Sequence, residues 1–138
     1  MSAWQIQELT LADYEAVMEL WNSTPGVRAT ESREEFERIL SRNPGLSCVI
    51  REGDRILGGI FCCHDGRRGY LYHLAVAPSY RRQGLARAMV DHCLAKLKQI
   101  GITRCTLFVL ADNVEGAAFW KHCGWRERVD LKAMAMDL

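Results

Sequence analysis

Apolar residues recur with a period of two in some segments of the chain and with a period near 3.6 in others. Residues 4–9, WQIQEL, alternate apolar and polar side chains and are predicted to form a first strand. Residues 11–21 carry apolar side chains at helical spacing, which predicts a helix. A loop containing Pro, Gly and Ser follows, and a second helix is predicted over residues 32–40, where Ser32 and Glu35 have the spacing of a capping box.

The middle of the chain predicts three consecutive strands. The runs LSCVIREG and RILGGIFCCH flank Gly53 and Asp54, a pair that is typical of a tight hairpin. The second run continues through the turn HDGRRG into the apolar run YLYHLAVAP. Residues 46–78 are therefore expected to form an antiparallel meander.

Beyond Pro78 the period changes to 3.6, which predicts a helix that ends at Gly101. Residues 103–110, TRCTLFVL, are then expected to form a buried strand, residues 112–125 a helix, and residues 127–136, ERVDLKAMAM, a last alternating strand. A helix that links two strands of one sheet makes them parallel, with a right-handed connection.

These elements predict an α/β fold in the order β-α-α-β-β-β-α-β-α-β, with a mixed central sheet of about six strands and helices on both faces. The chain has 138 residues, 49% of them hydrophobic, which is enough for one sizeable core, so residues 1–138 are interpreted as a single domain. A formal net charge of +1 gives no electrostatic case for binding nucleic acid or an anionic membrane. The first residues lack the pattern of a secretory signal, and no apolar run approaches the roughly 20 residues that span a bilayer, so we expect a cytoplasmic protein.

Six cysteines raise the question of a metal site or of disulfides. The chain contains the pieces CCH and HC but no C-x-x-C spacing, and the adjacent Cys62 and Cys63 of a strand would point to opposite faces. Cys48, Cys93 and Cys105 lie within apolar patterns, where a free cysteine behaves as a small buried hydrophobe. We therefore expect reduced thiols and no metal.

The stretch YRRQGLARAM, residues 80–89, begins where an apolar strand has ended and a helix is about to start. The first N–H groups of a helix have no internal partner and carry the positive end of its dipole, so a strand that leads into such an end creates an anion site. Gly84 leaves room for a phosphate beside the backbone, and Arg81 and Arg82 add charge. The alternative is two exposed arginines beside an ordinary helix start, because the stretch has neither the GxxxxGK[ST] nor the GxGxxG spacing.

Residues 76–86, VAPSYRRQGLA, resemble the V-x4-[QR]-x-x-G-x-[GA] signature of the GNAT superfamily of N-acetyltransferases. Further along, Asn113, Trp120 and the pair Gly124–Trp125 resemble the N-x6-Y-x3-G-F segment of that family. The predicted order of elements also matches the GNAT fold over nearly the whole chain. The HDGRRG turn, followed by a strand and RRQGLA, is similar to small single-domain bacterial members.

The resemblance implies an acyl-CoA ligand, most often acetyl-CoA, whose pyrophosphate would lie on the backbone N–H groups of residues 82–86. The strand before this loop would lend backbone groups to the pantetheine and to the acetyl carbonyl. Asn113 would either contact the pantetheine arm or only cap its own helix. The residues implied in cofactor binding are Leu74, Ala75, Val76, Arg81, Arg82, Gln83, Gly84, Leu85, Ala86, Asn113 and Trp120.

The catalytic groups are less defined. Members of the family that use a carboxylate or histidine base carry it on the strand before the signature, and here those positions are Tyr70 and Tyr72. A tyrosine is a poor base at neutral pH, so these two catalytic candidates would hold the acceptor or relay a proton through water, or else only pack on the strand. By strand parity, His73 is expected on the opposite face from Tyr72 as a satisfied sheet histidine, unless a bulge intervenes.

Trp120 stands where the family commonly has a tyrosine that protonates the leaving thiolate, and an indole N–H does not give up its proton at neutral pH. Either water does that work, or the chain is a non-catalytic acyl-CoA-binding or regulatory module. The favoured hypothesis is an acyl-CoA-dependent N-acyltransferase that moves an acetyl group from acetyl-CoA to a primary amine of a small molecule or peptide. We expect the acceptor pocket between the loop at residues 22–31 and the strand around Tyr70 and Tyr72. The acceptor itself and the oligomeric state, a homodimer included, stay open.

Overall fold

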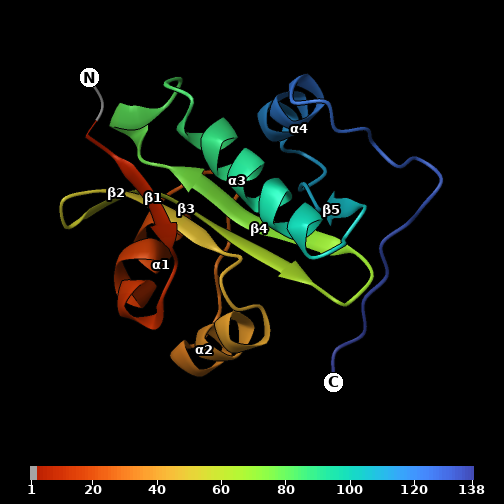
Figure 1. Cartoon of the computed structure of the whole chain (residues 1–138). Coiled ribbons are helices and arrows are strands. Elements are labelled where there is room, and N and C mark those ends of the chain that lie inside the picture. The colour runs from red at the N-terminus through yellow and green to blue at the C-terminus, as the bar shows by residue number, and fades with distance from the viewer. Residues whose placement is uncertain (1–2) are drawn as a thin grey trace. The chain divides into compact units, whose positions relative to one another are not determined.

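The structure is a computed structural model of the chain, and it describes residues 3–138 (Figure 1). The described chain divides into two compact units, residues 3–108 and residues 109–138. The interpretation of residues 1–138 as one domain therefore stays a prediction. Within residues 3–138 no helix is long and apolar enough to cross a membrane.

The first unit is a five-stranded sheet with helices packed against it. The strands lie in the order β1-β2-β3-β4-β5, antiparallel from β1 to β4 and parallel between β4 and β5. This order confirms the predicted meander and the predicted parallel pair. The elements of this unit are β1 (Gln5–Glu8), the 3₁₀ helix η1 (Leu11–Asp13), α1 (Tyr14–Asn22), α2 (Arg33–Arg42), β2 (Cys48–Glu52), β3 (Arg55–His64), β4 (Gly69–Val76), the 3₁₀ helix η2 (Pro78–Tyr80), α3 (Leu85–Gln99) and β5 (Cys105–Leu107).

Two adjacent glycines in β3 show that helices cover both faces of the sheet. A Cβ atom on Gly58 would lie 2.7 Å from Cε of Met89 in α3, whereas one on Gly59 would lie 2.6 Å from Cγ2 of Val17 in α1. Because successive strand residues point to opposite faces, α3 and α1 pack on opposite sides, as Figure 1 shows. Glycine at both positions lets the two helices approach the sheet closely.

Aromatic side chains fill the core on the α1 side of the sheet. Trp21, Phe36 and Phe61 are fully buried, and the ring centroids of Trp21 and Phe61 lie 4.6 Å apart. The predicted capping box at the start of α2 is confirmed, since Ser32 Oγ accepts from the N–H of Glu35 and the Glu35 carboxylate accepts from the N–H of Ser32. It stabilises the helix that carries Phe36 into the core.

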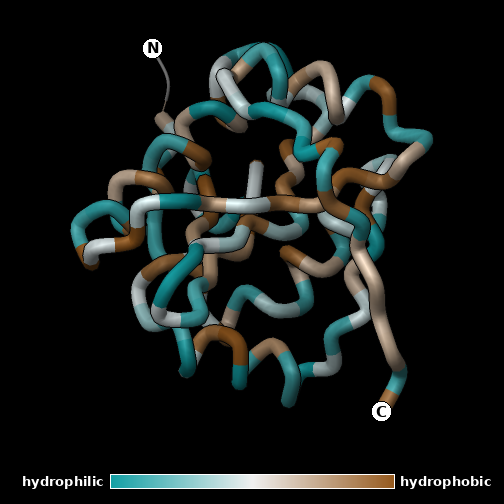
Figure 2. The backbone as a smooth tube through the Cα atoms, turned by 90° about the vertical axis from the view of Figure 1, so that its right-hand side faces the viewer, coloured by the Kyte–Doolittle hydropathy of each residue, from teal (hydrophilic) through white to brown (hydrophobic). Residues whose placement is uncertain are grey.

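The prediction of a last strand at residues 127–136 is wrong, and the predicted strand at residues 103–110 shrinks to Cys105–Leu107. The sheet therefore has five strands rather than six. In the second unit, which contains the helix α4 (Val114–His122), the apolar residues of the tail are uncovered: Val129 is 84% exposed and Met134 94% exposed. Alternation favours a strand only where a neighbouring strand satisfies the backbone, and residues 127–136 pair with no strand of the described chain. Figure 2 shows them as part of an extended, largely apolar tail.

Candidate active site

A β-bulge interrupts the pairing of β3 with β4. Gly59 pairs with Ala75 and Phe61 pairs with Tyr72, so that the single residue between Gly59 and Phe61 faces two residues of β4. The first of these, His73, has a φ of 61°, a left-handed value that is uncommon for a residue with a side chain. Such a conformation costs on the order of 1 to 3 kcal/mol and persists only where its surroundings hold it.

The bulge places the His73 ring on the α1 side of the sheet. Its centroid lies 5.1 Å from that of Trp21 and 5.7 Å from that of Phe61. Tyr72 pairs directly with Phe61 and so shares its face. Tyr72 and His73 therefore point to the same face: the bulge that was named as the exception to strand parity is present, and its extra residue shifts the alternation.

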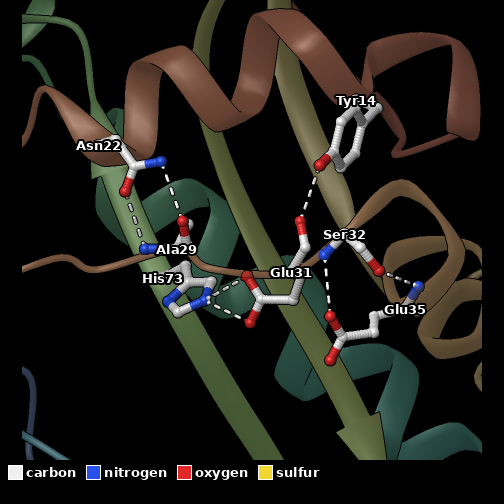
Figure 3. A network of polar contacts seen from close by, with 7 residues as sticks. All are labelled: Tyr14, Asn22, Ala29, Glu31, Ser32, Glu35 and His73. Carbon is white, nitrogen blue, oxygen red and sulfur yellow. Dashed lines mark hydrogen bonds and ion pairs between the residues drawn. The ribbon is translucent and has the colours of Figure 1, made fainter.

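His73 has a charged partner from the loop between α1 and α2, as Figure 3 shows. Its Nε2 atom lies 3.1 Å from Oε1 and 3.0 Å from Oε2 of Glu31, and the two side chains are 17% and 21% exposed. Burial acts to raise the pKa of Glu31, but hydrogen bonds from His73 and from the backbone outweigh it and hold the pKa below its ordinary value. The carboxylate is thus ionised at neutral pH and can only accept, so Nε2 of His73 carries the proton.

The same loop is fixed at two further points (Figure 3). The Asn22 side chain accepts from the N–H of Ala29 and donates to its carbonyl oxygen, at 2.9 and 3.0 Å. The hydroxyl of Tyr14 donates to the carbonyl oxygen of Glu31 at 2.7 Å. The loop that was expected to border the acceptor is therefore held against α1 at its base and against β4 at Glu31.

The two catalytic candidates on β4 lie together. The rings of Tyr70 and Tyr72 stack with centroids 6.3 Å apart, and Tyr72 is 39% exposed. Burial, followed by the nearby Cys63 and Tyr70, raises the pKa of Tyr72 above its ordinary value. The phenol therefore stays protonated at neutral pH, where it can donate a hydrogen bond but does not act as a base.

The loop from β4 to α3 ends in a left-handed glycine at the start of the helix. Gly84 precedes α3 with a φ of 86°, and a Cβ atom there would meet no atom within 4 Å, so the left-handed backbone, and not crowding, is what favours glycine. No side chain caps the first turn of α3 at this position. Arg81, Arg82 and Gln83 are exposed, and Nε of Arg81 donates to the carbonyl oxygen of Val76 at 3.1 Å. The loop is thereby tied to the end of the bulged strand.

In the second unit, the two predicted binding residues have local partners. The side chain of Asn113 accepts from the N–H of Gly116 at 2.9 Å, which confirms the N-cap. The Trp120 ring meets Phe119 and Trp125 edge to face, with centroids 5.1 and 5.2 Å apart. A role of Asn113 and Trp120 in cofactor binding stays a prediction.

Comparison with known proteins identifies the family. Residues 14–125 match the family model described as acetyltransferase (GNAT) family. An acetyltransferase of Sodalis glossinidius is 34% identical over 102 residues, which cover 73% of this chain and 72% of that protein. The chain belongs to the GNAT family of acetyltransferases. It is an N-acetyltransferase, and the expected fold class is confirmed.

Solved structures show the same GNAT fold. Ard1 from Thermoplasma volcanium superposes with a TM-score of 0.78 at 21% identity, covering 89% of this chain and 82% of that one. N-acetylglutamate synthase from Neisseria gonorrhoeae, complexed with coenzyme A and N-acetyl-glutamate, has a TM-score of 0.72 at 19% identity and covers 88% of this chain and 28% of that one. At these identities the likeness is one of fold.

Sequence reasoning missed one polar contact of the candidate site of this GNAT acetyltransferase, the contact of Glu31 with His73. The Glu31 carboxylate, the partner of His73, is a single acidic residue in an irregular loop, and no spacing marks it. The adjacent glycines Gly58 and Gly59 did carry a signal, since glycine inside a strand marks a bulge or a close approach, and both occur here. Within residues 3–138, no group of three or more His, Cys, Asp or Glu side chains is placed to hold a metal, and the six cysteines are free thiols.

Proposed function

We propose that this GNAT protein transfers an acetyl group from acetyl-CoA to a primary amine of a small molecule or peptide. The observation that carries the proposal is the bulged strand β4, which is followed, after the short helix η2, by the Gly84 turn at the start of α3. Acetyl-CoA supplies a thioester, and the protein's task is to hold it, to orient its carbonyl and to present a neutral amine.

The turn fits the pyrophosphate end of such a ligand. The backbone N–H groups of residues 82–86 lie at the positive end of a helix of 15 residues, and the space beside Gly84 is open. Arg81 and Arg82 add positive charge at the surface. These features support the assignment of Arg81, Arg82, Gln83, Gly84, Leu85 and Ala86 as the pyrophosphate-binding loop.

The bulge of β4 is suited to bind the acyl end of acetyl-CoA. The bulge leaves His73 and Leu74 outside the regular ladder with β3, and the ladder with β5 ends at Leu71, so backbone groups at this end of β4 can donate to a carbonyl oxygen without any special side chain. In this proposal Leu74, Ala75 and Val76 provide the backbone groups that orient the thioester. Tyr72, as a protonated phenol, serves as a hydrogen-bond donor to the acceptor or to a water molecule, and the loop at residues 22–31 borders the acceptor.

Gly84→Glu tests the pyrophosphate site, because it puts a carboxylate where the phosphate is expected. Gly53→Glu is the matched control, since Gly53 also has a positive φ, 61°, and open space around it, but lies in the hairpin between β2 and β3. Calorimetry should find acetyl-CoA affinity reduced by at least about tenfold in Gly84→Glu, or about 1.4 kcal/mol, and unchanged in Gly53→Glu. Equal affinities in both variants would refute the site.

A transfer assay tests the reaction. Thiol release from acetyl-CoA is followed with a panel of primary amines and short peptides, and mass spectrometry identifies the acetylated product. Release of thiol that depends on one class of amine supports the proposal and names the acceptor class. Binding of acetyl-CoA with no transfer to any amine of the panel would point instead to a non-catalytic acyl-CoA-binding module.

A further inference from the structure

The strained residue of the β4 bulge is held by contacts from three other segments. His73 keeps a left-handed backbone although it is not glycine. Glu31 binds its ring nitrogen through both carboxylate oxygens, and the rings of Trp21 and Phe61 flank it. These contacts come from the α1–α2 loop, from α1 and from β3, so they can stabilise a backbone conformation that the residue alone disfavours.

The neighbouring strand β3 is also held in place beside the bulge. The indole N–H of Trp21 donates to the carbonyl oxygen of Gly59, the β3 residue that borders the bulge, at 3.2 Å, and both groups are buried. Gly59 pairs with Ala75 of β4. Trp21 thus contacts both sides of the bulge, the His73 ring on β4 and the carbonyl group on β3.

The contact with Glu31 also decides where the α1–α2 loop lies (Figure 3). Asn22 makes two hydrogen bonds to Ala29, and Tyr14 donates to the carbonyl oxygen of Glu31, but all three of these bonds tie the loop to α1. The Glu31 side chain ties it to the sheet. The hydrogen-bonded contact of Glu31 with His73 therefore joins the loop expected to border the acceptor to the strand expected to orient the thioester.

We propose that Glu31 and His73 are positioning residues for acetyl transfer: Glu31 fixes the imidazole, the imidazole holds the β4 bulge in its left-handed conformation, and the pair aligns the acceptor loop with the acyl-binding backbone. The inference rests on the proposed function, because it takes the bulge as the acyl site. It assigns no proton transfer to either residue. It requires that losing the pair slows transfer while pyrophosphate binding at the Gly84 turn persists.

Substitutions of His73 separate this role from others. Glycine adopts a φ of 61° without strain, whereas alanine does not. If the ring serves to hold the backbone, His73→Gly should keep kcat at least about tenfold above that of His73→Ala, because misalignment by about 1 Å can cost about a hundredfold. Urea unfolding of the free protein should place His73→Gly at or above His73→Ala in stability, the reverse of the usual order for a strand. Equal kcat in both variants would mean that the ring acts directly or not at all, and would overturn the proposal.

Glu31→Gln supplies a second test that keeps the size of the side chain. We expect kcat to fall by about tenfold or more and the KM for the amine to rise, with acetyl-CoA affinity by calorimetry within about twofold of wild type. Glu34→Gln makes the same chemical change at an exposed neighbour and is the control. It should leave kcat, the KM for the amine and the acetyl-CoA affinity unchanged. An unchanged kcat in Glu31→Gln would refute the positioning role. Because the Gly84→Glu variant tests cofactor binding separately, unaltered acetyl-CoA affinity there would refute the proposed site, whatever Glu31 and His73 do.

Discussion

The indole N–H of Trp21 donates to the carbonyl oxygen of Gly59 across the interface between α1 and β3. Both residues are buried, so neither group can turn to water if the bond is lost. Trp21 also packs against Phe61 and His73. One residue of α1 therefore combines a buried hydrogen bond with the aromatic packing around the bulge.

Trp21→Phe should destabilise the protein by about 1 to 3 kcal/mol, because it keeps a ring but leaves the Gly59 carbonyl without its donor. Urea unfolding measures the change. A loss below about 0.3 kcal/mol would show that the hydrogen bond contributes nothing to stability.

Gly59→Ala should destabilise the protein by about 1 to 3 kcal/mol, because the new methyl group would lie 2.6 Å from Cγ2 of Val17. Val17→Ala removes that atom, so the double variant should be less destabilised than the sum of the two single changes. Strict additivity in this cycle would contradict the close approach of α1 to β3.

The contribution of Glu31 to stability should depend on pH. Its pKa is held below the ordinary value in the folded protein, so the stabilisation is fully present above the pKa of the unfolded chain, about 4.3, and is lost as the pH falls through the folded pKa. The difference in unfolding free energy between wild type and Glu31→Gln should thus be largest near neutral pH and shrink below about pH 4. A difference in unfolding free energy that grows as the pH falls would contradict this prediction.

Two half-buried cysteines should resist alkylation. Burial raises the pKa of both Cys63 and Cys105 to about 12, with neighbouring thiols adding to the effect, so almost no thiolate exists at neutral pH. Native-state treatment with iodoacetamide followed by peptide mapping should leave both residues unmodified until urea is added. Rapid labelling of Cys63 in the folded protein would contradict its burial.

Trp120→Phe should retain turnover within about threefold, because an indole N–H does not act as a proton donor at neutral pH and the phenyl ring can still pack against Trp125. Steady-state kinetics with acetyl-CoA provides the measurement. A fall of about a hundredfold in kcat at constant KM would instead assign about 2.7 kcal/mol of transition-state stabilisation to the N–H group.

Some segments of the fold could be predicted from the sequence, and others could not. The turn before α3 could be predicted because its backbone restricts the sequence: Gly84 adopts a φ of 86°, which glycine tolerates and other residues disfavour. The capping box of Ser32 and Glu35 could be predicted for a similar reason, since both bonds lie within four residues. In both cases the structural constraint acts within a few residues, so it is visible as a short sequence motif.

The bulge could not be placed from the sequence in the same way. The conformation of His73 depends on Glu31, which lies 42 residues earlier in the chain, and on rings from α1 and β3. The prediction of a strand in the tail was wrong for a different reason. Val129 and Leu131 have the alternation of a strand, but periodicity does not supply the neighbouring strand that would satisfy the backbone.

The short strand β5 has a consequence for how the sheet opens. The β4–β5 ladder consists of three pairs, from Gly69 with Cys105 to Leu71 with Leu107, and it lies at the edge of the sheet. The antiparallel pairs from β2 to β4 join neighbours in sequence through tight turns, whereas this parallel pair forms only after α3 has brought the chain back across the sheet. We therefore expect this ladder to open before the antiparallel pairs from β2 to β4 and to form after them, and we expect its amide protons to exchange with solvent sooner than those at the centre of β3.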